Sequence, residues 1–210
     1  AGFFGFIVQG ELKANWNIDV PWLWWVSVLI FAPLTAFLQW EGIKLSTRFM
    51  LITGGLEMII VMALAITGFL IPPPGSAGIT LNVFNPSFIP AGEGFALAVV
   101  FTVQGLTGWE ASAPLAEETK DPKRNVPLSV LLSIVLIGTF LVIVFWGVIT
   151  GFGNDADAIA NSPDLPALAL AHRVWGAGWI IILFAFLNSV AAVSIACANV
   201  GTRVWYGMAR

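Results

Sequence analysis

Charged side chains are scarce in this sequence. Asp, Glu, Lys and Arg make up 10% of its 210 residues, against about a quarter in soluble domains. So few charges cannot cover the surface of a water-soluble domain of this length. The hydrophobic fraction of 58% and the mean hydropathy of +0.90 indicate that lipid is the main solvent. The sequence therefore predicts an all-α, multi-pass protein of the plasma or inner membrane.

Cysteine, histidine and basic runs are nearly absent as well. Cys197 is the only cysteine, so an internal disulfide is excluded, and its apolar surroundings predict a small buried packing residue. The net charge of −3 and the lack of a basic run exclude nucleic acid as a partner. We expect no cofactor, no metal site and no catalytic group. The single histidine, His172, and its neighbour Arg173 are expected to face solvent in an outer loop.

Long apolar runs mark the segments expected to cross the membrane, since a helix needs about 20 apolar residues to cross a core of roughly 30 Å. Residues 1–9 are apolar but too short, and we interpret them as the end of an earlier helix. Both ends of the sequence are typical of the middle of a longer protein, and residues 1–210 are expected to form one transmembrane unit. The five expected spans are about 22–40, 48–71, 94–118, 128–151 and 176–200.

Lys and Arg are divided unevenly among the connections between these spans. Of the nine Lys and Arg residues, only Lys13 and Arg173 lie in the first, third and fifth connections. Because short cytoplasmic loops collect Lys and Arg, the other connections are predicted to lie inside. The outer connections are then 10–21, 72–93 and 152–175, and the inner ones are 41–48, 119–127 and the C-terminal end.

The expected span 94–118 is interrupted near its middle. Gly105 and Gly108 stand three residues apart, beside Gln104 and Thr107, and Glu110 follows. Backbone that leaves a helix at membrane depth is tolerated only where protein or water covers its polar groups. The glycines therefore indicate either an unwound segment that binds a polar ligand or close helix packing through small residues.

The residues that follow resemble a known family. Residues 101–127 read FTVQGLTGWEASAPLAEETKDPKRNVP. They resemble the sixth helix and next inner loop of amino acid–polyamine–organocation permeases, where Gly-Phe-Glu, Ala-Glu-Glu and Asn/Asp-Pro-x-Arg-x-x-Pro recur. Residues 42–48 are similar to the loop between helices four and five of that family, and residues 199–210 to the end of its helix eight.

This resemblance implies the end of helix three through helix eight of a twelve-helix carrier. It implies a partial LeuT-like fold of inverted repeats, in which helices one and six are unwound and jointly hold the substrate. Many members carry an aromatic gate residue where Gln104 stands, so Gln104 indicates a more polar pocket, a different gate or a bond to a neighbouring helix. The substrate's ammonium group is expected on Gln104, Gly105, Leu106, Thr107 and Gly108.

Glu57 is the main candidate for coupling transport to an ion. It lies within the span 48–71, where a charged side chain costs roughly 2.5–3.5 kcal/mol on insertion scales, so it must face protein or water. Some proton-coupled relatives carry a Lys at the matching place. Here the carboxylate either binds a cation or switches by its own protonation. The alternative is a structural Glu bonded to Asn188, Ser189 or Ser194 of the last helix.

Two further groups of charged residues were considered. Glu110 either couples ion movement or only ties the interrupted helix to its neighbours. The inner loop carries Glu117, Glu118, Lys123 and Arg124, which form either salt bridges of a cytoplasmic gate or a solvated charge run.

Together these patterns predict secondary active transport of amino acids or related amines by alternating access. Protons or sodium are the expected coupling ions, by symport or exchange, and a polyamine or amine antiporter of the same fold is the nearest alternative. A membrane-embedded enzyme would need paired ionisable residues or metal ligands within the bilayer. A channel or structural helix bundle would not need an interrupted helix followed by this inner-loop motif.

Overall fold

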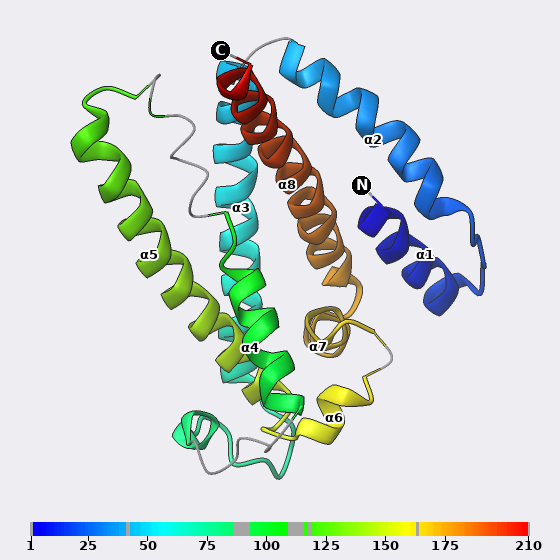
Figure 1. The fold of residues 1–210 in the computed structure, drawn as a ribbon. Coiled ribbons are helices and arrows are strands. Elements are labelled where there is room, and N and C mark those ends of the chain that lie inside the picture. The colour runs from blue at the N-terminus through cyan, green and yellow to red at the C-terminus, as the bar shows by residue number, and fades with distance from the viewer. Residues whose placement is uncertain are drawn as a thin grey trace.

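The structure is a computed structural model that describes residues 2–40, 43–85, 93–108, 116, 119–162 and 164–209. All regular elements within these ranges are helices (Figure 1), which confirms the all-α fold class. The α-helices are α1 (Gly2–Trp16), α2 (Leu23–Trp40), α3 (Ile43–Leu70), α4 (Glu93–Gly105), α5 (Pro122–Gly151), α6 (Ala156–Ala160), α7 (Pro166–Trp175) and α8 (Trp179–Met208). Two 3-10 helices, η1 (Leu81–Phe84) and η4 (Gly176–Gly178), complete the described elements.

Among the described residues, three helical segments are long and apolar enough to cross a membrane. They are Met50–Leu70, Pro122–Gly151 and Pro166–Met208. Shorter apolar stretches, Leu23–Leu34 and Gly94–Gly105, lie in α2 and α4. These segments confirm the predicted multi-pass membrane location, and five complete crossings stay a prediction.

Several helix boundaries differ from those expected. α1 continues to Trp16 instead of ending at residue 9, because Glu11, Leu12 and Lys13 are themselves good helix formers. α5 begins at Pro122 and runs through Pro127, whereas the sequence placed its start at Leu128. Pro122 occupies the first helical position, where proline is well tolerated because its missing N–H has no helical partner to lose.

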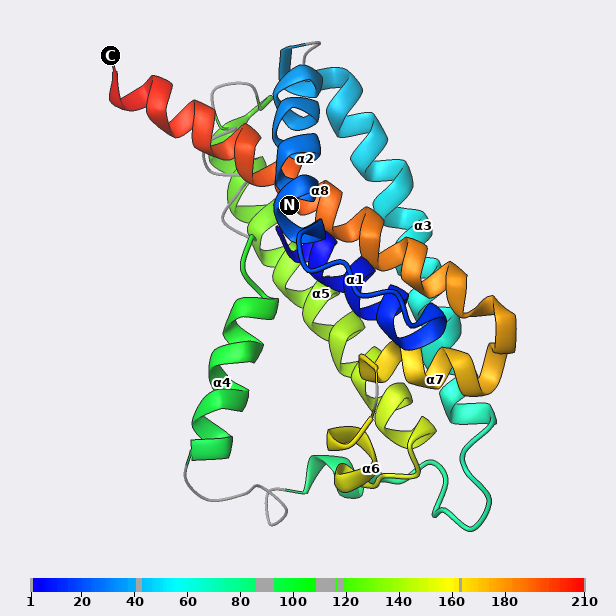
Figure 2. The same ribbon diagram turned by 90° about the vertical axis from the view of Figure 1, so that its right-hand side faces the viewer.

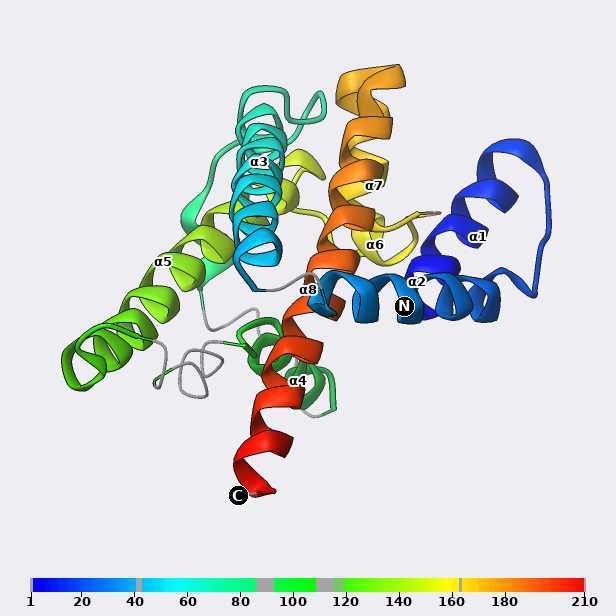
Figure 3. The same cartoon turned by 90° about the horizontal axis from the view of Figure 1, so that it is seen from above.

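The hydrophobic core lies where α3, α5, α7 and α8 meet. Leu64 of α3, Val148 of α5, Leu168 of α7 and Ile182 of α8 are all buried there. Seen from above, α8 lies between α3 and α5 on one side and α1 and α2 on the other (Figure 3). The core therefore joins helices from both halves of the chain.

Small residues allow α3 and α5 to pack closely. A Cβ atom on Gly147 would lie 2.6 Å from the carbonyl oxygen of Ala65, and one on Gly68 would collide with the carbonyl oxygen of Gly147. Helix packing in membranes depends on such close approach, because lipid supplies no hydrophobic driving force between helices. The contact between α3 and α5 therefore requires these two glycines.

Three side chains hold the connections together at one end of the bundle, where Figure 1 shows η1, α6 and α7. The indole N–H of Trp146 donates to Thr80 O (3.0 Å), the side-chain amide of Asn154 to Gly78 O (3.0 Å), and the guanidinium of Arg173 to Ile71 O (3.1 Å). We call these three hydrogen bonds the outer clamp, because the Lys and Arg distribution predicts this end to be outside.

Two predictions about single residues are wrong. His172 is only partly exposed: its ring stacks on Trp179 with centroids 4.4 Å apart, and its Nε2 atom is buried. The reason is α7, which packs on α8 in a region expected to be a loop. Cys197 is exposed and not a buried packing residue. It lies on an exposed face of α8, whose last turns extend away from the other helices (Figure 2).

Candidate functional site

α4 stops where the sequence predicts an interruption. The helix ends at Gly105, and its 13 residues reach only about 20 Å, less than the thickness of a hydrocarbon core. A tight turn follows, in which the amide of Thr107 donates to Gln104 O at 3.1 Å. Gly108 then has φ +111°, a conformation that disfavours any residue with a side chain. The backbone thus leaves the helix at Gly105 to Gly108.

This interruption opens onto a cavity of about 360 Å³, within the range of roughly 300–1,000 Å³ typical of small-molecule sites. Its wall combines the end of α4 and the turn that follows it with one face of α5. Of the five predicted substrate-binding residues, the structure brings Gly105, Leu106, Thr107 and Gly108 to the cavity, while Gln104 is exposed and does not line it. Figure 2 shows α4 standing apart from α3 and α8.

Sequence analysis missed the apolar Ile137 and two polar residues of this cavity, Ser129 and Ser133. Their hydroxyl groups donate to Val126 O (2.8 Å) and Val130 O (2.9 Å) of their own helix. A hydroxyl oxygen that donates its hydrogen still has lone pairs, so both serines can accept a hydrogen bond from a ligand. The pattern in the sequence that could have identified them is a pair of hydroxyl residues spaced i and i+4 on an apolar helix.

Hydroxyl groups of Thr107, Ser129 and Ser133 belong to the residues that line this cavity. The carbonyl oxygens of Thr102, Val103 and Gln104 at the end of α4 already accept hydrogen bonds from the amides of Leu106 and Thr107. No charged side chain is among the described residues that line the cavity. This arrangement suits an ammonium group, which has donors only.

Glu57 lies at a second, smaller site between α3 and α8. Its carboxylate accepts a hydrogen bond of 3.3 Å from the side-chain amide of Asn188, and the hydroxyl of Ser189 also bonds it. Ser194, the third partner considered from sequence, donates to Val190 O at 2.8 Å. The structure thus joins three of the predicted ion-coupling residues, Glu57, Asn188 and Ser189.

The cavity beside Glu57 has a volume of about 120 Å³ and is otherwise lined mainly by apolar side chains such as Leu56, Ile60 and Phe184. It has space for an ion or a few water molecules, since each water occupies about 30 Å³ of liquid volume. It shares no lining residue with the cavity at the α4 interruption. The two sites are therefore separate.

The structure describes only some of the other predicted site residues. Glu110, Glu117 and Glu118 lie outside the described residues. Lys123 and Arg124 are exposed in the first turn of α5. Within the described ranges, His, Cys, Asp and Glu side chains do not come together in groups of three or more that could hold a metal ion. The cytoplasmic gate stays a prediction.

A multi-pass helical bundle with one helix interrupted beside a cavity is an architecture that membrane carriers use. The chain belongs to the amino acid permease family, whose model matches residues 3–210. The predicted membership of the permease superfamily is thereby confirmed. This family comprises transporters and not enzymes.

Three curated relatives illustrate the range of this family. The chain is 25% identical over 203 residues to the L-methionine/branched-chain amino acid exporter YjeH of Escherichia coli, covering 93% of the chain and 44% of the relative. It is 28% identical over 156 residues to the putrescine transporter PotE of Haemophilus influenzae, covering 70% and 34%. It is 24% identical over 153 residues to the human b(0,+)-type amino acid transporter 1, covering 71% and 30%.

The chain thus spans less than half the length of each of these relatives. No solved structure matches it significantly.

Proposed function

We propose that the full protein is a secondary active transporter of amino acids or related amines that works by alternating access. The observation that carries this proposal is the interruption of α4 at Gly105 to Gly108, which opens onto a cavity that Thr107, Ser129 and Ser133 help to line. An interrupted helix at membrane depth is the usual means by which carriers offer backbone groups to a substrate.

The names of the relatives support an amine-containing substrate. They describe transporters of methionine and branched-chain amino acids, of putrescine and of amino acids. An ammonium group is common to all these compounds. In our proposal Leu106, Thr107 and the adjacent glycines receive this group, with Gln104 beside them as a gate residue.

Ion coupling is assigned to Glu57 together with Asn188 and Ser189. A carboxylate inside a membrane helix stays there only with a partner or an ion, and the 120 Å³ cavity beside Glu57 has space for a small cation. Either cation binding or protonation at Glu57 would change the interaction between α3 and α8. Glu110 is a second candidate, and Lys123 and Arg124 with Glu117 and Glu118 would form the inner gate.

Uptake by the full-length protein in proteoliposomes tests this function. Radiolabelled leucine, methionine and putrescine are offered separately, with an imposed proton gradient, a sodium gradient or an internal store of unlabelled substrate. We expect saturable accumulation of at least one of them that depends on a gradient or on exchange. A flux that does not saturate would indicate a channel, and no flux would indicate a structural bundle.

A further inference from the structure

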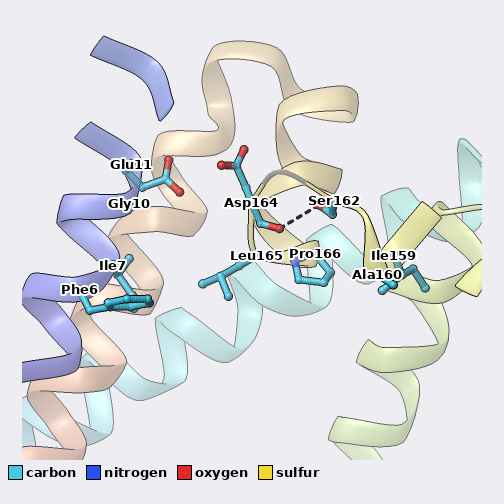
Figure 4. Close-up of a pocket in the computed structure, with 10 residues that line it drawn as sticks. All are labelled: Phe6, Ile7, Gly10, Glu11, Ile159, Ala160, Ser162, Asp164, Leu165 and Pro166. Carbon is cyan, nitrogen blue, oxygen red and sulfur yellow. Dashed lines mark hydrogen bonds between the residues drawn. The ribbon is translucent and has the colours of Figure 1, made fainter. Parts of the chain in front are cut away.

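The two ends of the bundle differ in charge. At the end that carries the outer clamp, the carboxylates of Glu11 and Asp164 line a cavity between α1 and the segment joining α6 to α7, whose described lining contains no Lys, Arg or His (Figure 4). At the opposite end, α5 begins with two exposed cations, Lys123 and Arg124. Neither of them forms an ion pair with a carboxylate in the described part of the chain. Because the first turn of a helix is also the positive end of its macrodipole, an anionic partner would stabilise this end of α5.

The first half of α5 has two different faces. One face carries the two serines that line the cavity at the α4 interruption. On the other, Arg124, Leu128, Leu131 and Val135 follow one another at intervals of four, three and four residues, so they lie above one another along the helix. At about 100° per residue, this face lies roughly opposite the serines. We call these four residues the Arg124 face.

The Arg124 face has no partner among the described helices. Leu128 is 47% exposed, Leu131 62% and Val135 62%. The buried residues of α5 all lie at or beyond Val144, where the helix meets α3. Figures 1 and 3 show the start of α5 standing apart from α3. The face is therefore open to whatever surrounds the bundle at the inner end.

The depth of the two cations matches the headgroup layer of a bilayer. The apolar part of α5 begins at Leu128, and Arg124 lies four residues earlier, about 6 Å along the helix. The headgroup layer is roughly 5–8 Å deep on each side of the hydrocarbon core. With Leu128 at the edge of this core, Lys123 and Arg124 therefore lie at the depth of the lipid phosphates.

An anionic phospholipid is the occupant that this arrangement fits. Its acyl chains would lie on the three apolar side chains of the Arg124 face, and its phosphate would accept charge-assisted hydrogen bonds from Arg124 and Lys123. A zwitterionic lipid has the same chains and phosphate, but its cationic group is repelled by the two cations. A free phosphate ion would gain nothing from the apolar side chains. Charge complementarity thus favours a lipid with net negative charge.

We propose that the Arg124 face is a binding site for an anionic phospholipid of the inner leaflet, on the side of α5 opposite the transport cavity. The bound headgroup neutralises Lys123 and Arg124. In the inner gate proposed above, the same cations pair with Glu117 and Glu118, so a bound headgroup would compete with that pairing. The lipid site itself does not depend on transport, because it is tested by contact with lipid alone.

Site-specific photocrosslinking tests the proposal on the full-length protein, in nanodiscs of phosphatidylcholine with a minor fraction of phosphatidylglycerol. The photoreactive residue p-benzoylphenylalanine replaces Val135, and mass spectrometry identifies what it captures. We expect phosphatidylglycerol to be captured well above its share of the bilayer. Lys123→Gln and Arg124→Gln are each expected to lower this enrichment roughly fivefold, the contribution typical of one cation at a membrane surface.

Two matched controls separate this site from general lipid contact. Phe145 is 61% exposed on the same helix, which carries no charge after Arg124. The photoreactive residue at Phe145 should capture both lipids in their bulk ratio. Lys13→Gln removes a cation that is already paired with Asp19 at 3.4 Å, and it should leave the enrichment at Val135 unchanged. Equal enrichment at Val135 and Phe145, or equal losses in Lys13→Gln and Arg124→Gln, would overturn the proposal.

Salt and free phosphate keep the test decisive if a charge variant fails to fold. Sodium chloride at about 1 M shortens the Debye length to roughly 3 Å, so it should abolish the enrichment at Val135 without any charge variant. Millimolar inorganic phosphate should leave the enrichment unchanged, and its loss would indicate a site for free anions instead. Capture of another segment of the protein itself, or of both lipids in their bulk ratio, would likewise overturn the proposal.

Discussion

Asn188 of α8 donates its side-chain amide to the carboxylate of Glu57 on α3, at 3.3 Å and across 131 residues of sequence. This bond is a polar contact between two long apolar helices. In the proposed mechanism, protonation or ion binding at this carboxylate would alter the packing of α3 against α8.

Replacement of this carboxylate tests its role in coupling. Glu57→Gln keeps the side-chain shape but removes the group that binds a proton or a cation. We expect uptake to lose its dependence on pH or on the coupling cation, while folding is retained because an amide can still bond Asn188 and Ser189. The measurement is initial uptake between pH 5 and pH 8 in proteoliposomes.

Asp157→Asn is the matched control for Glu57, since it neutralises an exposed carboxylate by the same chemical change. It should keep the wild-type pH profile. An unchanged pH and cation dependence in well-folded Glu57→Gln would remove Glu57 from the coupling mechanism.

The conformation of Gly108 is the most direct test of the interrupted helix. Its φ of +111° disfavours any L side chain, at a cost of order 1–3 kcal/mol. We expect Gly108→Ala to reduce substrate affinity roughly fivefold or more, measured as the substrate concentration at half-maximal uptake. Gly201→Ala, at a helical glycine with open space around it, should have no such effect. Equal uptake by both variants would contradict a role for the turn.

Ser133 tests the contribution of α5 to the same cavity. Ser133→Ala removes one acceptor, and a typical hydrogen bond contributes about 0.5–1.5 kcal/mol. We predict an increase of roughly two- to tenfold in the half-saturating substrate concentration, without loss of thermal stability. Thr139→Ala removes a hydroxyl from the same helix outside the cavity. If both variants change affinity equally, the cavity is not the binding site.

The close packing of α3 and α5 leads to a prediction about stability. Gly147→Ala would place a methyl group 2.6 Å from Ala65 O, and overpacking of this kind costs roughly 1–3 kcal/mol. The thermal unfolding midpoint in detergent should fall. Gly138→Ala on the same helix meets nothing within 4 Å and should leave the midpoint unchanged or raise it. A stable Gly147→Ala protein would show that the helices can separate at little cost.

Local sequence signals predicted the main functional features of the fold. Gly105 and Gly108 predicted the place where α4 ends, because few other residues tolerate the backbone that follows. The cost of a carboxylate in lipid marked Glu57, and its three candidate partners were all on α8. Sequence could not choose among them, since that choice depends on how α3 and α8 are rotated against each other.

The errors concern residues whose surroundings are set by distant parts of the chain. His172 lies in a segment that the sequence analysis assigned to an outer loop, yet α7 places its ring on Trp179. Cys197 has apolar neighbours in sequence, but it lies on a face of α8 that the other described helices leave exposed. Ser129 and Ser133 were overlooked because hydroxyls in apolar helices usually bond their own backbone, and both of these do so as well.

The outer clamp has a consequence for the order of events during synthesis. Its acceptors, Ile71 O, Gly78 O and Thr80 O, emerge from the ribosome well before their donors, which follow 102, 76 and 66 residues later. Since chains are made from the N-terminus, Trp146 is available first, Asn154 second and Arg173 last. The hydrogen bond at the outer end of α3 can therefore form only after α7 has been synthesised. If membrane insertion paused between α5 and α7, Ile71 O would lack its guanidinium partner during the pause.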